Sequence, residues 1–200
     1  MLPDTRCSQL IDALIGTDKE SQSEAIRELE DKSKLDCLRL ALDSESTPDY
    51  VKETLCEILY RARWPEAAPI LIRQLSASSP RVRSLAADGL AVIRDVSSGP
   101  ALLRLLEDPE QPEFVRDTVA LALGLVGYRP AWEALAKHLR DPAKTVRQCA
   151  AKGLMFLAEP RATPALETAL EEEEIPSVQE QIKKALAAIR AKGLPSPEGN

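Results

Sequence analysis

The sequence predicts an all-α protein, a right-handed α-solenoid of stacked helical hairpins, with about five to six repeats of about 32 residues. Composition favours helix, because Leu and Ala dominate the apolar residues while aromatic residues reach only 4%. Four segments of the chain align with one another without gaps, and their apolar residues follow the helical period of 3.6. One hairpin cannot bury its own apolar face, so the copies are expected to stack on one another.

Each copy of the repeat begins at a valine, which we number as offset zero. These valines are Val51, Val82, Val115, Val146 and, in a degenerate fifth copy, Val178, at spacings of 31, 33, 31 and 32 residues. Apolar residues at offsets zero, four, eight and eleven form one face of a helix. Offset five is always small, which allows a neighbouring helix to approach closely; its residues are Cys56, Ala87, Ala120 and Ala151.

A proline near offset fourteen or fifteen is expected to end this helix and to open the next one, as at Pro65, Pro130 and Pro160. A second helix of about 11 residues and a polar turn complete the predicted hairpin. The register weakens before Val51, where a helix over 3–15 and a degenerate hairpin over 21–29 and 35–42 are expected. We therefore predict a single domain over 1–194, made of an N-terminal cap (1–47) and regular repeats (48–191), with a flexible tail at 195–200.

Two motifs carry a resemblance to a known family. Val-Arg-x-x-Ala-Ala at Val146 and Pro-x-Ala-x-Pro-Ala-Leu at Pro160 resemble HEAT-like repeats, and more narrowly the short repeats of phycobilisome-lyase-type proteins. The resemblance covers about residues 49–191 and implies the solenoid fold. It says little about function, because such folds serve many binding tasks.

Charge and composition exclude or weaken several classes of function. A net charge of −6 weakens nucleic-acid binding, which requires a cationic face. With one histidine, a multi-histidine metal site is excluded, and four scattered cysteines form no Cys-x-x-Cys motif. We expect buried thiols in a reducing compartment. The sequence shows neither a signal peptide nor a membrane-length apolar run, so we expect a soluble, cytoplasmic protein with no membrane or metal partner.

A column of arginines at offset one, formed by Arg83, Arg116 and Arg147, has two interpretations. It could bind a phosphate or carboxylate, but we favour the structural ladder of HEAT repeats, in which an arginine early in one helix pairs with an aspartate of the turn. Asp141 and Arg147 have the six-residue separation of that pattern, and Asp108 and Arg116 approximate it.

No motif for catalysis stands out. The paired carboxylates lie in predicted turns, and neither a nucleophile elbow nor a glycine-rich phosphate loop is present. His138 is expected at the surface near a helix end. We therefore expect no enzyme activity, no catalytic residue and no cofactor.

The helix face opposite the buried arc, at offsets two, six, nine and thirteen, is the predicted concave groove. Most of the few aromatic residues fall on it, together with charged residues, which is typical of an interaction hot spot. In the alternative interpretation, Trp64 and Tyr128 cover turns between repeats and Phe156 is core. The predicted partner-binding residues are Glu57, Tyr60, Trp64, Asp88, Leu121, Leu125, Tyr128, Lys152, Met155 and Phe156.

The favoured function is a non-catalytic scaffold or adaptor that binds a peptide or helix of a protein partner along this face. The resemblance allows an alternative, an accessory lyase-type subunit of a chromophore- or cofactor-attaching enzyme. Nucleic-acid binding, known for some HEAT-like DNA glycosylases, is disfavoured because the N-terminal half of the predicted groove is acidic.

Overall fold

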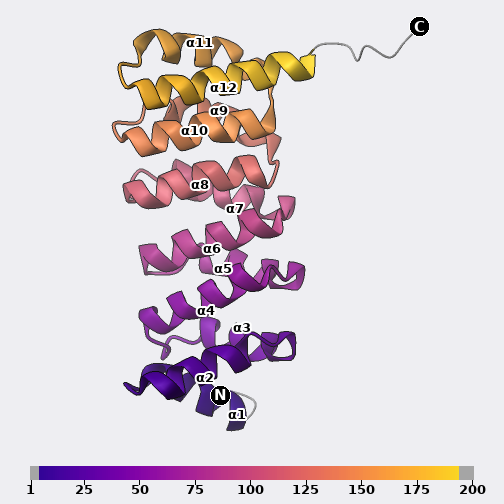
Figure 1. Cartoon of the computed structure of the whole chain (residues 1–200), viewed down its shortest axis with the longest axis vertical. Coiled ribbons are helices and arrows are strands. Elements are labelled where there is room, and N and C mark those ends of the chain that lie inside the picture. Colours follow the sequence, from indigo (N-terminus) through magenta and orange to yellow (C-terminus); the bar gives the residue numbers. More distant parts are fainter. Residues whose placement is uncertain (1–4, 194–200) are drawn as a thin grey trace, which may run out of the picture. The chain divides into compact units, whose positions relative to one another are not determined.

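The computed structural model describes residues 5–193, and every regular element among them is helical (Figure 1). The predicted all-α class is confirmed. The predicted tail at 195–200, and Pro3 and Asp4 of the first predicted helix, lie outside the described residues. The chain divides into two compact units, residues 1–93 and 94–200, and each is described by itself. The single domain expected over 1–194 stays a prediction.

The described part of the first unit alternates short and long helices after an N-terminal cap. Helix α3 packs against α4, α5 packs against α6, and the long helices α4 and α6 pack side by side. A short 3₁₀ turn that starts at Pro65 leads into α5, as the proline position predicts. The α-helices are α1 (Thr5–Ile15), α2 (Lys19–Leu29), α3 (Leu35–Asp43), α4 (Asp49–Ala62), α5 (Ala68–Gln74) and α6 (Pro80–Ile93).

The described part of the second unit repeats the same alternation three times. Short helices α7, α9 and α11 pack against the long helices that follow them, and α10 packs between α8 and α12 (Figure 1). The helices are α7 (Gly99–Glu107), α8 (Glu113–Leu125), α9 (Trp132–His138), α10 (Lys144–Leu157), α11 (Thr163–Glu172) and α12 (Pro176–Gly193).

The hairpins differ from the prediction in phase. We expected each long helix to pair with the short helix after it, whereas each short helix packs mainly against the long helix that follows. Such a hairpin is closed by the polar turn, and the proline turn connects successive hairpins. The sequence period is the same in both descriptions, so the spacing of the repeats alone could not decide between them.

The core is built from the predicted face of the long helices. At offsets zero, four and eight, α4 contributes Val51, Leu55 and Leu59, which are at most 1% exposed. The equivalent residues of α6, α8 and α10 are buried to the same extent, as are the small residues at offset five. Full burial of one such Val or Leu side chain contributes about 2 kcal/mol, so these rows hold the stacked helices together.

Helices α8 and α10 approach each other closely at two glycines, Gly124 and Gly153. A Cβ atom built on Gly124 would lie 2.5 Å from the Cα of Gly153, and one on Gly153 would lie 2.6 Å from the carbonyl oxygen of Ala120. No side chain fits at that spacing, because such atoms would overlap. The glycines therefore allow the close packing of α8 against α10.

The long helices end in one recurring backbone conformation. Offset twelve has a positive φ in four successive repeats, at Arg63 (54°), Arg94 (59°), Gly127 (76°) and Ala158 (45°). This left-handed conformation at a helix C-terminus frees the chain to turn, and glycine adopts it at the lowest cost. Only one of the four copies has glycine, so the other three carry local strain.

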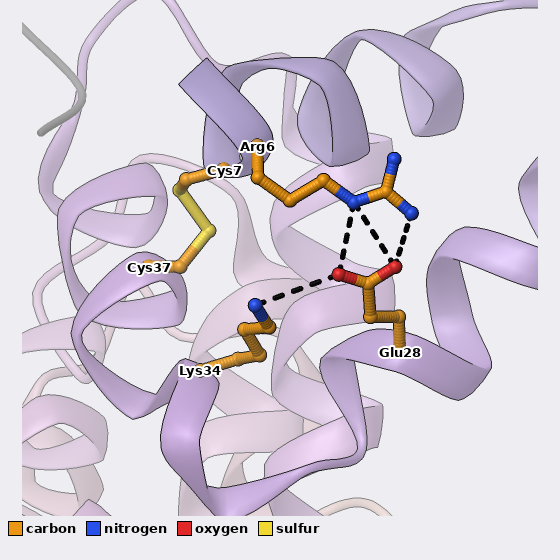
Figure 2. Close-up of a disulfide and its surroundings, with 5 residues drawn as sticks. All are labelled: Arg6, Cys7, Glu28, Lys34 and Cys37. Atoms are coloured by element: carbon orange, nitrogen blue, oxygen red, sulfur yellow. Dashed lines mark hydrogen bonds and ion pairs between the residues drawn. A yellow bond between two sulfur atoms is a disulfide. The ribbon is translucent and has the colours of Figure 1, made fainter. Parts of the chain in front are cut away.

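The N-terminal cap is held by a disulfide that the sequence analysis did not predict. Cys7 on α1 is bonded to Cys37 on α3, with their Cα atoms 5.6 Å apart (Figure 2). The expectation of reduced thiols is therefore wrong for these two cysteines, because folding of the degenerate cap brings together residues 30 positions apart. Cys56 and Cys149 remain outside the disulfide, and Cys56 is fully buried, as predicted.

Ion pairs reinforce the same cap. The Nε of Arg6 lies 3.0 Å from Oε1 of Glu28 on α2, and its Nη2 contacts Oε2. Lys34 approaches the same carboxylate at 3.5 Å (Figure 2). These pairs lower the pKa of Glu28, chiefly through its hydrogen bond to Arg6.

Within residues 5–193, no helix combines the length and apolar character needed to cross a membrane.

Candidate functional site

The arginine column forms a structural ladder within the second unit. The Nε and Nη2 atoms of Arg116 donate to the two carboxylate oxygens of Asp141 at 2.9 Å each, and Nη1 donates to the carbonyl oxygen of Gln111 at 2.7 Å. The side chains of Arg116 and Asp141 are 18% and 6% exposed. All these donors are therefore held by the fold rather than offered to a ligand.

Arg147 forms the next rung of this ladder. Its Nε and Nη2 lie 2.6 and 3.1 Å from the carboxylate oxygens of Glu173, and Nη1 donates to the carbonyl oxygen of Asp141 at 2.9 Å. The predicted structural role agrees with this geometry, but the carboxylate partner differs. Each arginine reaches forward to the acid of the following turn, while it binds the near turn through a backbone carbonyl.

The pKa values of the two ladder carboxylates, Asp141 and Glu173, are both lowered, but by different combinations of causes. Burial raises the pKa of Asp141, but hydrogen bonds from Arg116 and from the backbone N–H of Ala143 outweigh burial and bring the pKa below its usual value. The hydrogen bond from Arg147 is the largest cause that lowers the pKa of Glu173. Both carboxylates therefore stay ionised at neutral pH.

A groove on the first unit gathers three of the predicted partner-binding residues. Glu57 and Tyr60 of α4 and Asp88 of α6 line a surface depression of about 530 Å³. Tyr60 is 40% exposed, Glu57 is exposed and Asp88 is half-buried. We call this depression the α4 groove; its lining is Ile26, Thr54, Glu57, Tyr60, Arg61, Leu85 and Asp88.

Sequence reasoning missed the other four residues that line the α4 groove. Thr54 and Leu85 occupy offset three and Arg61 occupies offset ten, one position beside the predicted rows. Ile26 comes from α2 in the cap, where no repeat register guides prediction. The apolar character shared by Ile26 and Leu85 was the available signal. Arg61 is held by Glu30 at the end of α2, with Nη2 2.8 Å from Oε1.

Two aromatic residues predicted for the groove, Trp64 and Tyr128, lie at turns between helices. Trp64 is half-buried and begins the 3₁₀ turn before α5. Tyr128 begins the corresponding turn before α9, and its ring lies against Gly99, where an added Cβ would lie only 2.1 Å from the ring. These positions agree with the alternative interpretation, in which the two side chains cover turns.

The remaining predicted residues lie on α8 and α10 of the second unit. Phe156 is 44% exposed, so its alternative assignment to the core is wrong. Met155 is half-buried, and its sulfur accepts a hydrogen bond from Nε2 of Gln181 at 3.8 Å. Half-buried Leu121, Leu125 and Lys152 lie on the same two helices. Their role in binding stays a prediction.

His138 is half-buried rather than at the surface. It is the last residue of α9, and its Nδ1 lies 2.8 Å from the carbonyl oxygen of Ala134, one turn back along the helix. The contact uses one ring nitrogen to satisfy the helix backbone. This histidine therefore has a local structural role in the described part of the chain.

The repeated hairpins, the buried valine rows and the arginine ladder define a helical-repeat protein of the α-solenoid class. The HEAT repeats family matches residues 35–116 and 110–187, and the chain belongs to that family.

The complex of CpcE and CpcF of phycocyanin lyase from Nostoc sp. PCC7120 is 18% identical, with a TM-score of 0.60, over 94% of this chain and 96% of that chain. A designed armadillo repeat protein in complex with the peptide (KR)4 is 18% identical, with a TM-score of 0.65, over 92% of this chain and 100% of that one. At these identities, both similarities show the fold alone.

Two curated relatives correct the expectation that the chain is not an enzyme. Deoxyhypusine hydroxylase of Aspergillus clavatus is 27% identical over 180 residues, which are 86% of this chain and 53% of that protein. Deoxyhypusine hydroxylase of Gallus gallus is 32% identical over 98 residues, 48% of this chain and 33% of that protein. Both carry the name of an enzyme, so the expectation of no enzyme activity is contradicted. The chain spans about half the length, or less, of these relatives.

The name hydroxylase implies an oxygen-activating group, of which a non-haem iron centre is one kind. A non-haem iron centre uses two histidines and a carboxylate. This chain has one histidine, and no three His, Cys, Asp or Glu side chains converge among residues 5–193. The described residues therefore do not fit a resident iron centre of that type.

Proposed function

We propose that the chain binds a polypeptide segment of a protein partner and that the α4 groove is the binding site. The observation that carries this proposal is the convergence of Glu57, Tyr60 and Asp88 around one depression. Its volume, about 530 Å³, lies in the range of pockets that hold small ligands. An exposed aromatic beside apolar and charged groups is the usual composition of a binding hot spot.

The helices that form this groove give it a rigid frame. Thr54, Glu57, Tyr60 and Arg61 project from α4, whose opposite face is anchored in the core by fully buried residues. A preformed site loses little conformational entropy on binding. The designed armadillo protein in complex with the peptide (KR)4 is an example of a similar fold that binds a peptide. We infer the same general mode for this chain.

The test is selection of peptides from a random display library on the immobilised protein. Selected peptides should bind the wild type and lose most of their affinity for a Tyr60→Ala, Leu85→Ala double variant. Phe114→Ala is the matched control, because Phe114 is as exposed as Tyr60 but lies on the second unit and is not among the predicted partner-binding residues. Circular dichroism should show unchanged helicity in all variants. Failure to enrich any peptide, or equal binding by the double variant, would contradict the proposal.

The two hydroxylase relatives favour a second candidate function, participation in an enzymatic hydroxylation. The test is to incubate the chain with a polypeptide containing deoxyhypusine, with dioxygen as the oxidant and a reductant, with and without added iron, and to measure the product by mass spectrometry. Gain of one oxygen atom that depends on the chain would support this candidate. An unchanged substrate mass would count against it.

A further inference from the structure

We propose that the α4 groove selects the long cationic side chain of a lysine or arginine in its partner. This inference rests on the proposed peptide-binding function and specifies the chemistry of the partner. Three features of the groove lead to it: one carboxylate that has no partner among residues 5–193, a second carboxylate on the adjacent helix, and apolar residues in the same lining.

Glu57 is the carboxylate that a cationic partner would meet first. It lies on the exposed face of α4, and no hydrogen bond or ion pair to it is present among residues 5–193. The positive charge of Arg61 is already engaged by Glu30, with the two side chains 2.8 Å apart. The charge available to a ligand at this part of the groove is therefore negative. A negatively charged partner would meet repulsion there.

A second acid, Asp88, lines the groove from the adjacent helix α6. It occupies offset six of α6, as Glu57 does on α4, so the repeat places an acid at equivalent positions of two adjacent long helices. The charge of Glu57 also acts on the neighbouring thiol of Cys56. Burial is the main cause that raises the pKa of Cys56 to about 12, and the charges of Glu53 and Glu57 add to it.

The apolar residues of the groove suit the aliphatic part of such a side chain. Ile26 and Leu85 line it from two different helices, and Tyr60 lines the same groove. Lysine and arginine pack their methylene groups on apolar surfaces while the charged end reaches a polar partner. An aromatic ring beside the site adds attraction for a cation. A short or anionic side chain uses neither feature.

The experiment uses the peptides selected from the random library, with each lysine or arginine replaced by norleucine or glutamate. Norleucine keeps the lysine stem without the charge. Lysine and arginine should be enriched among selected peptides, and norleucine replacement should weaken binding about three- to tenfold. Glu57→Gln should cause a similar loss for the lysine peptide and none for the norleucine peptide. Binding of the lysine peptide should weaken as salt is added.

Glu45→Gln is the matched control, because Glu45 is an exposed acid of the same unit that does not line the groove. It should leave every affinity unchanged. Peptides that depend on Tyr60 but bind equally with norleucine, and equally to Glu57→Gln, would overturn this inference and leave the proposed function standing. If no peptide is selected at all, both fail together.

Discussion

Two nitrogens of Arg116 on α8 donate hydrogen bonds of 2.9 Å to the carboxylate of Asp141, although the two residues are 25 positions apart. The pair ties one repeat to the turn of the next and is largely shielded from solvent. Replacing Arg116 by Ala leaves a shielded carboxylate without its partner, so we expect the free energy of unfolding to fall by about 3 kcal/mol. Urea denaturation checks this.

The control for that prediction is Arg140→Ala. Arg140 also binds a carboxylate with two nitrogens, that of Glu172, but its side chain is 58% exposed. Solvent screens such an exposed pair, so this variant should be nearly neutral. Equal losses in the two variants would contradict the role assigned to the ladder.

The ladder also predicts a loss of stability in acid. The pKa of Glu173 is lowered in the folded protein, first by its hydrogen bond to Arg147, from an ordinary value of 4.5. A lowered folded-state pKa stabilises the protein above the ordinary value, and this stabilisation disappears as pH falls through the folded-state pKa. The stability difference between wild type and Glu173→Gln should therefore be largest near neutral pH and shrink below about pH 4.5. A difference that stays constant down to low pH would contradict the assignment.

Replacing an arginine by glycine should stabilise the protein at a strained helix end and destabilise it inside a helix. Arg63 is exposed and has a φ of 54°, so Arg63→Gly should raise the free energy of unfolding by about 0.5–1 kcal/mol. Arg104 is exposed within α7, where the same change should lower it by about 1 kcal/mol. Thermal denaturation of both variants checks the signs. A loss at both positions would contradict the strain at offset twelve.

The cap disulfide predicts a response to reductant. Cys7 and Cys37 close a loop with a separation of 30 residues, which constrains the unfolded chain and contributes about 3 kcal/mol. Dithiothreitol should therefore lower the unfolding temperature of the wild type. Cys37→Ser should unfold at the lower temperature with or without reductant. Thiol titration of the unreduced, denatured protein should find two thiols; four would contradict the disulfide.

The repeat register explains what the sequence could predict. Rows such as Val51, Leu55 and Leu59 follow from the helical period, because equivalent offsets fall on equivalent faces. The same register placed Glu57, Tyr60 and Asp88 on one surface. It failed in the cap, where the contribution of Ile26 to the groove and the pairing of Cys7 with Cys37 depend on tertiary packing without a repeat.

The ladder shows a different limit of sequence reasoning. The six-residue separation of Asp141 and Arg147 correctly indicated contact, but the contact uses the backbone carbonyl of Asp141. The carboxylate of Asp141 is turned toward Arg116 of the preceding long helix. Side-chain direction across a repeat boundary depends on three-dimensional stacking, which a linear spacing does not contain.

The central claim, that the α4 groove binds a peptide, is tested most directly by mapping where a selected peptide touches the protein. Backbone amide shifts in a heteronuclear NMR titration give that map. We predict shifts concentrated on α2, α4 and α6 around Tyr60 and Leu85. Shifts confined to α8 and α10 around Phe156, with no change near Tyr60, would contradict the account.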